Sequence, residues 1–300
     1  MHLKRVVKTA RDLAAPYRVT SGSRFRLRDF DPADTGSMHA GDRPSAQEAL
    51  TAGIGALAAL QDRLYARHEW ALLIIFQAMD AAGKDSAIKH VMSGVNPQGC
   101  VVHSFKAPSA EELDHDYLWR AVKVLPERGR IGIFNRSYYE ELLVVRVHPE
   151  LLARQKLPAA IVHKNIWKER ANDIRHVEQY LAHNGIVILK FFLHVSKREQ
   201  RKRLLERLDT PEKNWKFNID DLKERERWDD YMDSYEDAIR RTATGHAPWY
   251  IVPADHKWFT RLVVASAIID ALGSLDLRYP EVDEAQRREL ARARSILGEK

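Results

Sequence analysis

The chain has 300 residues, of which 45% are hydrophobic and 30% are charged, and its formal net charge is +6. This composition can bury a substantial core, which excludes global disorder, and no apolar run reaches the roughly 20 residues that span a bilayer. The single cysteine, Cys100, excludes an internal disulfide, and no apolar segment follows the basic N-terminus, so we expect a cytoplasmic protein without a secretory signal.

The spacing of apolar residues changes along the chain from helix-like to strand-like. Gly, Pro and Asp turns in residues 1–45 predict an extended arm, and the Ala/Leu pattern of residues 45–67 predicts a helix. Five short apolar runs then have the length of strands. The predicted strands are 70–76, 101–105, 130–134, 186–192 and 249–252. The helices predicted after the first strand are one that ends near residue 94, then 110–125, 137–147, 158–183, 196–208, 219–241 and 258–272.

Strands that alternate with helices indicate a parallel sheet with helices on both faces. The first strand is apolar throughout, as is typical of strands buried on both faces. We therefore predict a three-layer α/β/α fold with a five-stranded parallel sheet. The chain divides into an N-terminal arm and helix (1–67), an α/β domain (68–277) and a charged tail (278–300) that is either a solvated helix or frayed.

The segment after the first strand, residues 78–86, reads AMDAAGKDS and leads into a helix. Such a strand–loop–helix unit is typical of a phosphate-binding loop, where backbone N–H groups hold phosphate oxygens and a lysine neutralises the transferring group. It departs from G-x-x-x-x-G-K-[ST], because Ala78 replaces the first glycine and Asp85 the Mg²⁺-binding hydroxyl. The predicted phosphate-binding residues are Ala82, Gly83, Lys84, Asp85 and Ser86. An ordinary helix start capped by Asp85 is the alternative.

Asp80 lies inside this loop. A carboxylate among phosphate-binding amides is unfavourable unless a metal ion or a proton-bearing acceptor lies beside it. We therefore predict that Asp80 positions Mg²⁺ or the acceptor.

The third predicted strand ends in a second polar motif, NRSYYEE, at residues 135–141. Because the carboxyl ends of parallel strands face the ligand crevice, Asn135 occupies the place where a P-loop enzyme normally carries an Asp near the metal. Arg136 would reach phosphate oxygens with its fork of donors. An Asn/Ser helix cap with a solvated arginine is the alternative. Three further cations would make the crevice cationic: Lys106, Arg120 and Arg146.

Residues 197–207 carry six cations and two acids. At 3.6 residues per turn they spread over several helix faces, so some are ordinary solvated charges, but Arg203 and Arg207 share a face. Trp215, close to Lys216, either stacks on a base or anchors a loop.

Five ordered blocks resemble the polyphosphate kinase type 2 family, and the resemblance covers about residues 17–272. The blocks are 77–85, 134–140, 146–150, 193–200 with 211–217, and 247–255. The resemblance implies a P-loop kinase fold like that of thymidylate kinase, with a helical lid at about 196–227. It also implies Mg²⁺-dependent, reversible phosphoryl transfer between inorganic polyphosphate and nucleotides.

Carried over to matching positions, the resemblance assigns roles to individual residues. The catalytic residues would be Asp80, Lys84, Asn135 and Arg136, with Asp80 and Asn135 at the metal. Arg203, Arg207 and Lys216 would belong to the lid over the polyphosphate. The predicted nucleotide-binding residues are Tyr139, Glu140 and Trp215. Within the family the strand-end motif commonly has Asp at position 135, and Asn135 together with Ala78 resembles the subgroup that phosphorylates both nucleoside mono- and diphosphates.

The expected ligands are therefore Mg²⁺, polyphosphate, AMP, ADP and ATP, with no nucleic acid or membrane partner, in a homodimer or homotetramer. Two alternatives remain: a nucleoside monophosphate kinase that uses ATP, and a polyanion-binding module without activity. Lys84 together with Asp80 argues against binding alone. A polyphosphate donor needs a long cationic track, whereas an ATP donor needs an adenine pocket.

Overall fold

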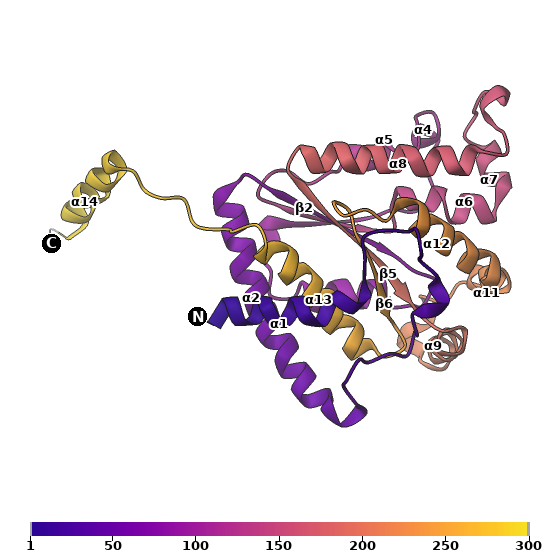
Figure 1. Cartoon of the computed structure of the whole chain (residues 1–300), viewed down its shortest axis with the longest axis horizontal. Helices are drawn as coiled ribbons and strands as arrows, with labels where there is room; N and C mark the ends of the chain where they lie inside the picture. Colours follow the sequence, from indigo (N-terminus) through magenta and orange to yellow (C-terminus); the bar gives the residue numbers. More distant parts are fainter. Residues whose placement is uncertain (1, 299–300) are drawn as a thin grey trace.

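The computed structural model describes residues 2–298, and these form a six-stranded sheet with helices on both faces (Figure 1). The strands are β1 (Arg18–Val19), β2 (Ala71–Gln77), β3 (Cys100–Ser104), β4 (Ile131–Asn135), β5 (Ile186–His194) and β6 (Trp249–Pro253). Their order is β1-β6-β5-β2-β4-β3. The five predicted strands are present and parallel, but the sheet is mixed, because β1 pairs antiparallel with β6. A two-residue edge strand is too short to leave a sequence pattern.

The α-helices of the described chain form layers around this sheet. They are α1 (His2–Ala14), α2 (Arg43–Arg67), α3 (Lys84–Val91), α4 (Ala110–Leu113), α5 (Trp119–Val122), α6 (Val144–Val147), α7 (Pro149–Ala153), α8 (Ile166–His183), α9 (Lys197–Asp209), α10 (Pro211–Asn214), α11 (Asp220–Glu226), α12 (Trp228–Thr242), α13 (Lys257–Gly273) and α14 (Glu284–Gly298). Helices α8 and α12 cover one face, while α3 and α13 cover the other and carry α1 and α2 outside them. Helix α14 stands apart from the body (Figure 1).

Strand β2 positions the site. All seven of its residues are buried, and it lies between β4 and β5. The chain builds β3 and β4 on one side of β2 and then crosses to build β5 and β6 on the other. The carboxyl ends of β2, β4 and β5 therefore meet where the connections change direction, which is where open α/β sheets bind ligands.

The extended arm predicted for residues 1–45 is wrong for its first part, because α1 is a helix that packs on α13. Its apolar side chains meet α13 closely: a Cβ on Gly273 would lie 2.5 Å from a methyl carbon of Val7. Arg11 adds a 2.7 Å ion pair to Asp270 on α13. The apolar residues that pack inward have helical spacing: Leu3, Val6, Val7 and Ala10. The Gly, Pro and Asp turns that predict an extended arm lie further along the chain.

Several long predicted helices are also shorter or interrupted. The prediction 110–125 divides into α4 and α5, and 219–241 divides into α11 and α12. Helix α8 begins at Ile166 rather than at 158, and 137–147 begins as a 3₁₀ turn before α6. At Asp116 and Ser137 the side chain accepts a hydrogen bond from a backbone N–H two residues on. Such local bonds compete with helix formation.

A buried ion pair ties β5 to α8. Lys190 and Glu178 are both fully buried, and Lys190 Nζ donates to Glu178 Oε2 at 2.6 Å. The same ammonium also donates to the Tyr139 hydroxyl at 3.0 Å and to the Thr242 carbonyl at 2.8 Å. Burial lowers the pKa of Lys190, and the charge of Glu178 opposes this shift.

Replacing Lys190 with methionine should lower the free energy of unfolding by about 3–5 kcal/mol, because it leaves the Glu178 carboxylate buried and without its cation. Urea unfolding measures the change, and exposed Lys168→Met on α8 is the matched control. The double variant Lys190→Met/Glu178→Leu should regain much of the loss. A double variant less stable than Lys190→Met would contradict this account.

Candidate active site

The loop between β2 and α3 has the backbone shape of an anion cradle. Ala81 and Gly83 have positive φ angles of 61° and 110°, a conformation that glycine adopts freely and alanine adopts only under strain. The turn brings the backbone N–H groups of Lys84, Asp85 and Ser86 to the helix start, where they have no acceptor within residues 2–298. Free N–H groups at a helix N-terminus attract anions.

Lys84 extends from the first turn of α3 back over the loop. Its Nζ donates to the carbonyl of Ala78 at 3.0 Å. Burial lowers the pKa of Lys84 and the Arg136 guanidinium lowers it further, whereas the charge of Asp80 raises it. An anion bound here would therefore stabilise the charged form of Lys84.

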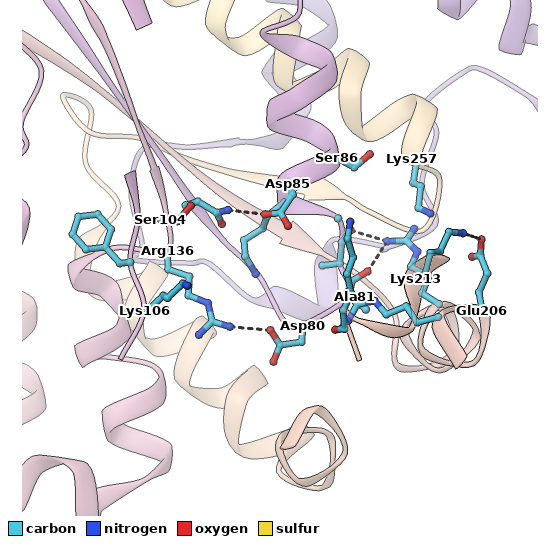
Figure 2. Close-up of a pocket in the computed structure, with 18 of the residues that line it drawn as sticks. Asp80, Ala81, Asp85, Ser86, Ser104, Lys106, Arg136, Glu206, Lys213 and Lys257 are labelled. Atoms are coloured by element: carbon cyan, nitrogen blue, oxygen red, sulfur yellow. Dashed lines mark hydrogen bonds and ion pairs between the residues drawn. The ribbon is translucent and has the colours of Figure 1, made fainter. Parts of the chain in front are cut away.

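The structure joins the two predicted motifs through two contacts (Figure 2). Arg136 Nη2 donates to Asp80 Oδ1 at 2.9 Å. Asn135 Nδ2 donates to Asp85 Oδ1 at 2.6 Å. Arg136 also has a positive φ of 63°, which turns the chain sharply at the end of β4.

Helix α9 holds the loop backbone in place. Arg203 is 4% exposed, and its donors are used inside the protein. They bind the carboxylate of Glu199 and, at 2.6–3.3 Å, the carbonyl oxygens of Ala81, Ala82, Ala254 and Asp255. Gln200 Nε2 binds the Asp80 carbonyl at 3.0 Å. Arg203 therefore supports the loop backbone, and its predicted role at the polyphosphate stays a prediction.

A cavity of about 640 Å³ lies over the loop. Eight cations line it: Lys84, Lys106, Arg136, Arg203, Arg207, Lys213, Lys216 and Lys257. Three carboxylates line it as well: Asp80, Asp85 and Glu206. The lining therefore carries a formal charge of +5, from eight positive and three negative groups. We call it the cationic cavity, and it suits a polyanion.

A second cavity of about 230 Å³ lies on the other side of Asp80. Its lining includes five carboxylates and two aromatic rings: Asp80, Glu140, Asp220, Asp221, Glu224, Tyr231 and Tyr235. Burial and the neighbouring charge of Asp80 raise the pKa of Asp221, against the effect of Arg207. We call it the acidic cavity. Asp80 and Arg136 line both cavities, so the two spaces meet at this ion pair.

Two of the predicted nucleotide-binding residues lie outside both linings. Tyr139 is fully buried and its hydroxyl donates to Glu178 at 2.8 Å, so that prediction is wrong and Tyr139 is a core residue. Trp215 is 78% exposed, and its indole N–H donates to the Glu212 carbonyl at 3.0 Å. Glu140 does line the acidic cavity, where it accepts a 2.8 Å hydrogen bond from Gln77.

Two predicted cations of the crevice also act elsewhere. The Arg120 side chain contacts other protein groups: it donates to the Lys106 carbonyl at 2.8 Å and lies over the Phe105 ring. It therefore positions Lys106 rather than lining the cavity. Arg146 forms a 2.5 Å ion pair with Asp237, and neither cavity includes it.

Distant helices also contribute residues to the site that the sequence motifs do not predict. Helix α11 gives the acidic cavity three carboxylates and α12 gives it two tyrosines, while Lys257 is the first residue of α13. Gln200 lies in the block 193–200 of the family resemblance, but nothing in its neighbours along the chain predicts its bond to the Asp80 carbonyl.

Within residues 2–298 no three His, Cys, Asp or Glu side chains are placed to hold a metal ion. Mg²⁺ commonly uses one or two carboxylates and takes its remaining ligands from water and substrate phosphates. Asp80, at the junction of the cavities, fits this pattern. No helix in the described range has both the length and the apolar character needed to span a bilayer.

The sheet, the loop and the cationic cavity define an α/β protein that handles phosphorylated ligands. Residues 41–279 match the family model Polyphosphate kinase 2 (PPK2), so the chain belongs to the polyphosphate kinase 2 family and is a polyphosphate kinase. This confirms the resemblance seen in the sequence.

Relatives of known name are similar to this chain over most of its length. An ADP-polyphosphate phosphotransferase of Rhodopseudomonas palustris is 55% identical, and the alignment spans 83% of this chain and 87% of that protein. An AMP/ADP-polyphosphate phosphotransferase of Meiothermus ruber is 45% identical, and the alignment spans 91% of this chain and 97% of that protein. The crystal structure of Polyphosphate Kinase 2 from Arthrobacter aurescens TC1 superposes with a TM-score of 0.83 at 41% sequence identity. The superposition covers 93% of this chain and 96% of that chain.

Proposed function

We propose that this chain is a Mg²⁺-dependent polyphosphate:nucleotide phosphotransferase that phosphorylates both AMP and ADP reversibly. The observation that supports it best is the meeting of the cationic and acidic cavities at Asp80 and Arg136. We further propose that residues 68–277 form a P-loop kinase domain of the thymidylate kinase type. In that domain the segment 196–227, with α9 to α11, acts as the lid. A nucleoside monophosphate kinase that depends on ATP is not favoured by the family.

The cationic cavity suits the donor. Its eight cations can neutralise a chain that carries about one negative charge per phosphate, as basic grooves do for nucleic-acid backbones. The acidic cavity would repel such a chain. Its carboxylates can instead accept hydrogen bonds from ribose hydroxyls and from amino groups of a base, while Tyr231 and Tyr235 offer aromatic surface.

We infer that the reaction takes place at the junction of the two cavities. The terminal phosphoryl group would lie by Lys84 and the N–H groups of the α3 start, and the acceptor phosphate would approach from the acidic cavity beside Asp80. The P–O bond to the rest of the chain breaks, a new P–O bond forms to the acceptor phosphate oxygen, and the donor leaves one phosphate shorter. Arg136 lines both cavities and would stabilise the charge on the transferring oxygens. Mg²⁺, held by Asp80, would neutralise phosphate charge.

With long-chain polyphosphate and Mg²⁺, AMP should be converted to ADP and then to ATP. Asn135 is uncharged and bonded to Asp85, so the end of β4 adds no negative charge near the acceptor phosphates. A coupled ATP assay with AMP or ADP, each with and without polyphosphate, measures this. Asn135→Asp, the matched variant, should narrow the acceptor range.

The arms of this assay separate the alternatives. If ADP is phosphorylated and AMP is not, the proposal that the enzyme accepts both nucleotides is wrong, but its family membership is unaffected. A further reaction that contains AMP, ATP and Mg²⁺ but no polyphosphate tests the monophosphate kinase, and rapid formation of ADP in it would favour that alternative.

A further inference from the structure

The position of the junction fixes a direction for the donor chain, given the proposed function. The reacting end must lie at Asp80 and Arg136, because only there does the cationic cavity meet the acidic one. Figure 2 shows Arg136 and Lys106 toward one end of the cationic cavity and Lys213 and Lys257 toward the other, with the loop between them. The phosphates that are not transferred therefore extend away from the junction, toward Lys213 and Lys257.

Helix α13 contributes one cation to the lining of the cationic cavity and a second one, outside the lining, that contacts Ser86. Lys257 is its first residue, is exposed on the cavity wall, and has no carboxylate within ion-pair distance in the described part of the chain. Arg261 follows one helical turn later, so both side chains project from the same face of α13. Neither residue belongs to the two sequence motifs of the site.

Arg261 has unusual surroundings for a partly buried arginine. Its Nη2 donates to Ser86 Oγ at 2.9 Å, while its Nε is buried without a partner. Across residues 2–298 no carboxylate forms an ion pair with it, whereas Arg203 and Arg207 pair with Glu199 and Asp221. A positive charge that is partly withdrawn from water and has no carboxylate partner would gain from an anionic ligand nearby.

The hydrogen bond to Ser86 links Arg261 to the cationic cavity. Arginine has no acceptor, so Ser86 Oγ must accept from Arg261. Its own hydrogen stays free to donate to a group in the cationic cavity, which Ser86 lines. The contact therefore orients one further hydroxyl donor next to Lys84.

We propose that α13 forms one wall of the polyphosphate path. Lys257 contacts phosphates behind the one that is transferred. Arg261 is a positioning residue that directs the Ser86 hydroxyl to the donor and adds positive potential behind it. The acceptor nucleotide does not touch this wall.

Steady-state kinetics of Lys257→Gln, Arg261→Gln and the double variant test the path. The double variant should raise the KM for long-chain polyphosphate by about tenfold or more, as expected for a lost charged hydrogen bond, and leave the KM for ADP unchanged. The salt dependence of the polyphosphate KM should become shallower by about one unit of log–log slope per lost phosphate contact. Lys257→Gln should raise the KM for tripolyphosphate less than it raises the KM for long-chain polyphosphate. Lys202→Gln, an exposed cation on α9 outside this cavity, is the control.

A double-mutant cycle of Arg261→Gln with Ser86→Ala separates positioning from a purely structural role. If Arg261 acts through Ser86, the two effects on the polyphosphate KM should not add. A lowered Tm with a wild-type polyphosphate KM in Arg261→Gln would overturn its role, and an unchanged KM in Lys257→Gln would overturn the path. A wild-type enzyme that makes no ATP from ADP and polyphosphate would instead refute the proposed function itself.

Discussion

Lys84→Ala should lower kcat with polyphosphate and ADP by about 10²–10³-fold, the usual loss for one donor to a transferring charge. Lys84 Nζ has only the Ala78 carbonyl as a hydrogen-bond partner in the described chain, and it faces the cationic cavity beside the free N–H groups of α3. Its removal therefore leaves no core cavity, and the loss should fall on the transition state.

Thermal unfolding of the same variant separates this loss from damage to the fold. The Tm should stay close to that of the wild type, and Lys89→Ala, an exposed lysine on the same helix, should keep both Tm and kcat. Normal turnover in a well-folded Lys84→Ala protein would remove the loop from the catalytic site.

Asp80→Asn should be nearly inactive. The substitution keeps the size of the side chain but removes the carboxylate that both cavities share and that pairs with Arg136 at 2.9 Å. A metal ion at a phosphoryl oxygen is worth several kcal/mol, so loss of its ligand corresponds to about 10²–10⁴-fold in kcat. Excess Mg²⁺ should recover part of the activity if the carboxylate acts by holding the ion.

Wild-type enzyme in EDTA provides the parallel measurement, and it should lose activity that added Mg²⁺ restores. Asp209→Asn, at the end of α9 and outside both cavities, is a suitable control. Full activity of Asp80→Asn, or of wild-type enzyme in EDTA, would exclude the assigned role.

The sequence predicted the parts of this site that depend on adjacent residues. A continuous apolar strand followed by a Gly-Lys loop indicates the end of β2, and Asn135 and Arg136 follow another strand in the same way. The parallel arrangement of those strands then brings the two motifs together, as the 2.9 Å contact from Arg136 to Asp80 shows.

Burial and distant packing could not be predicted in this way. Tyr139 follows the second motif directly, yet its side chain turns into the core toward Glu178. Arg203 lies in a run of cations, yet its guanidinium is enclosed by backbone carbonyls from two other segments. A residue type and its neighbours in the chain do not show which way a side chain points once helices and strands pack.

The bonds between α9 and the loop also limit which part of the proposed lid we expect to move. Gln200 and Arg203 attach α9 to the loop carbonyls from Asp80 to Ala82, so moving α9 away from the loop would break these hydrogen bonds. Helix α11 is joined to α9 by side-chain contacts, Arg225 to Gln200 and Asp221 to Arg207. For the lid that we propose, we therefore expect the hinge after α9, in residues 209–219, because a hinge there leaves the shape of the phosphate cradle unchanged.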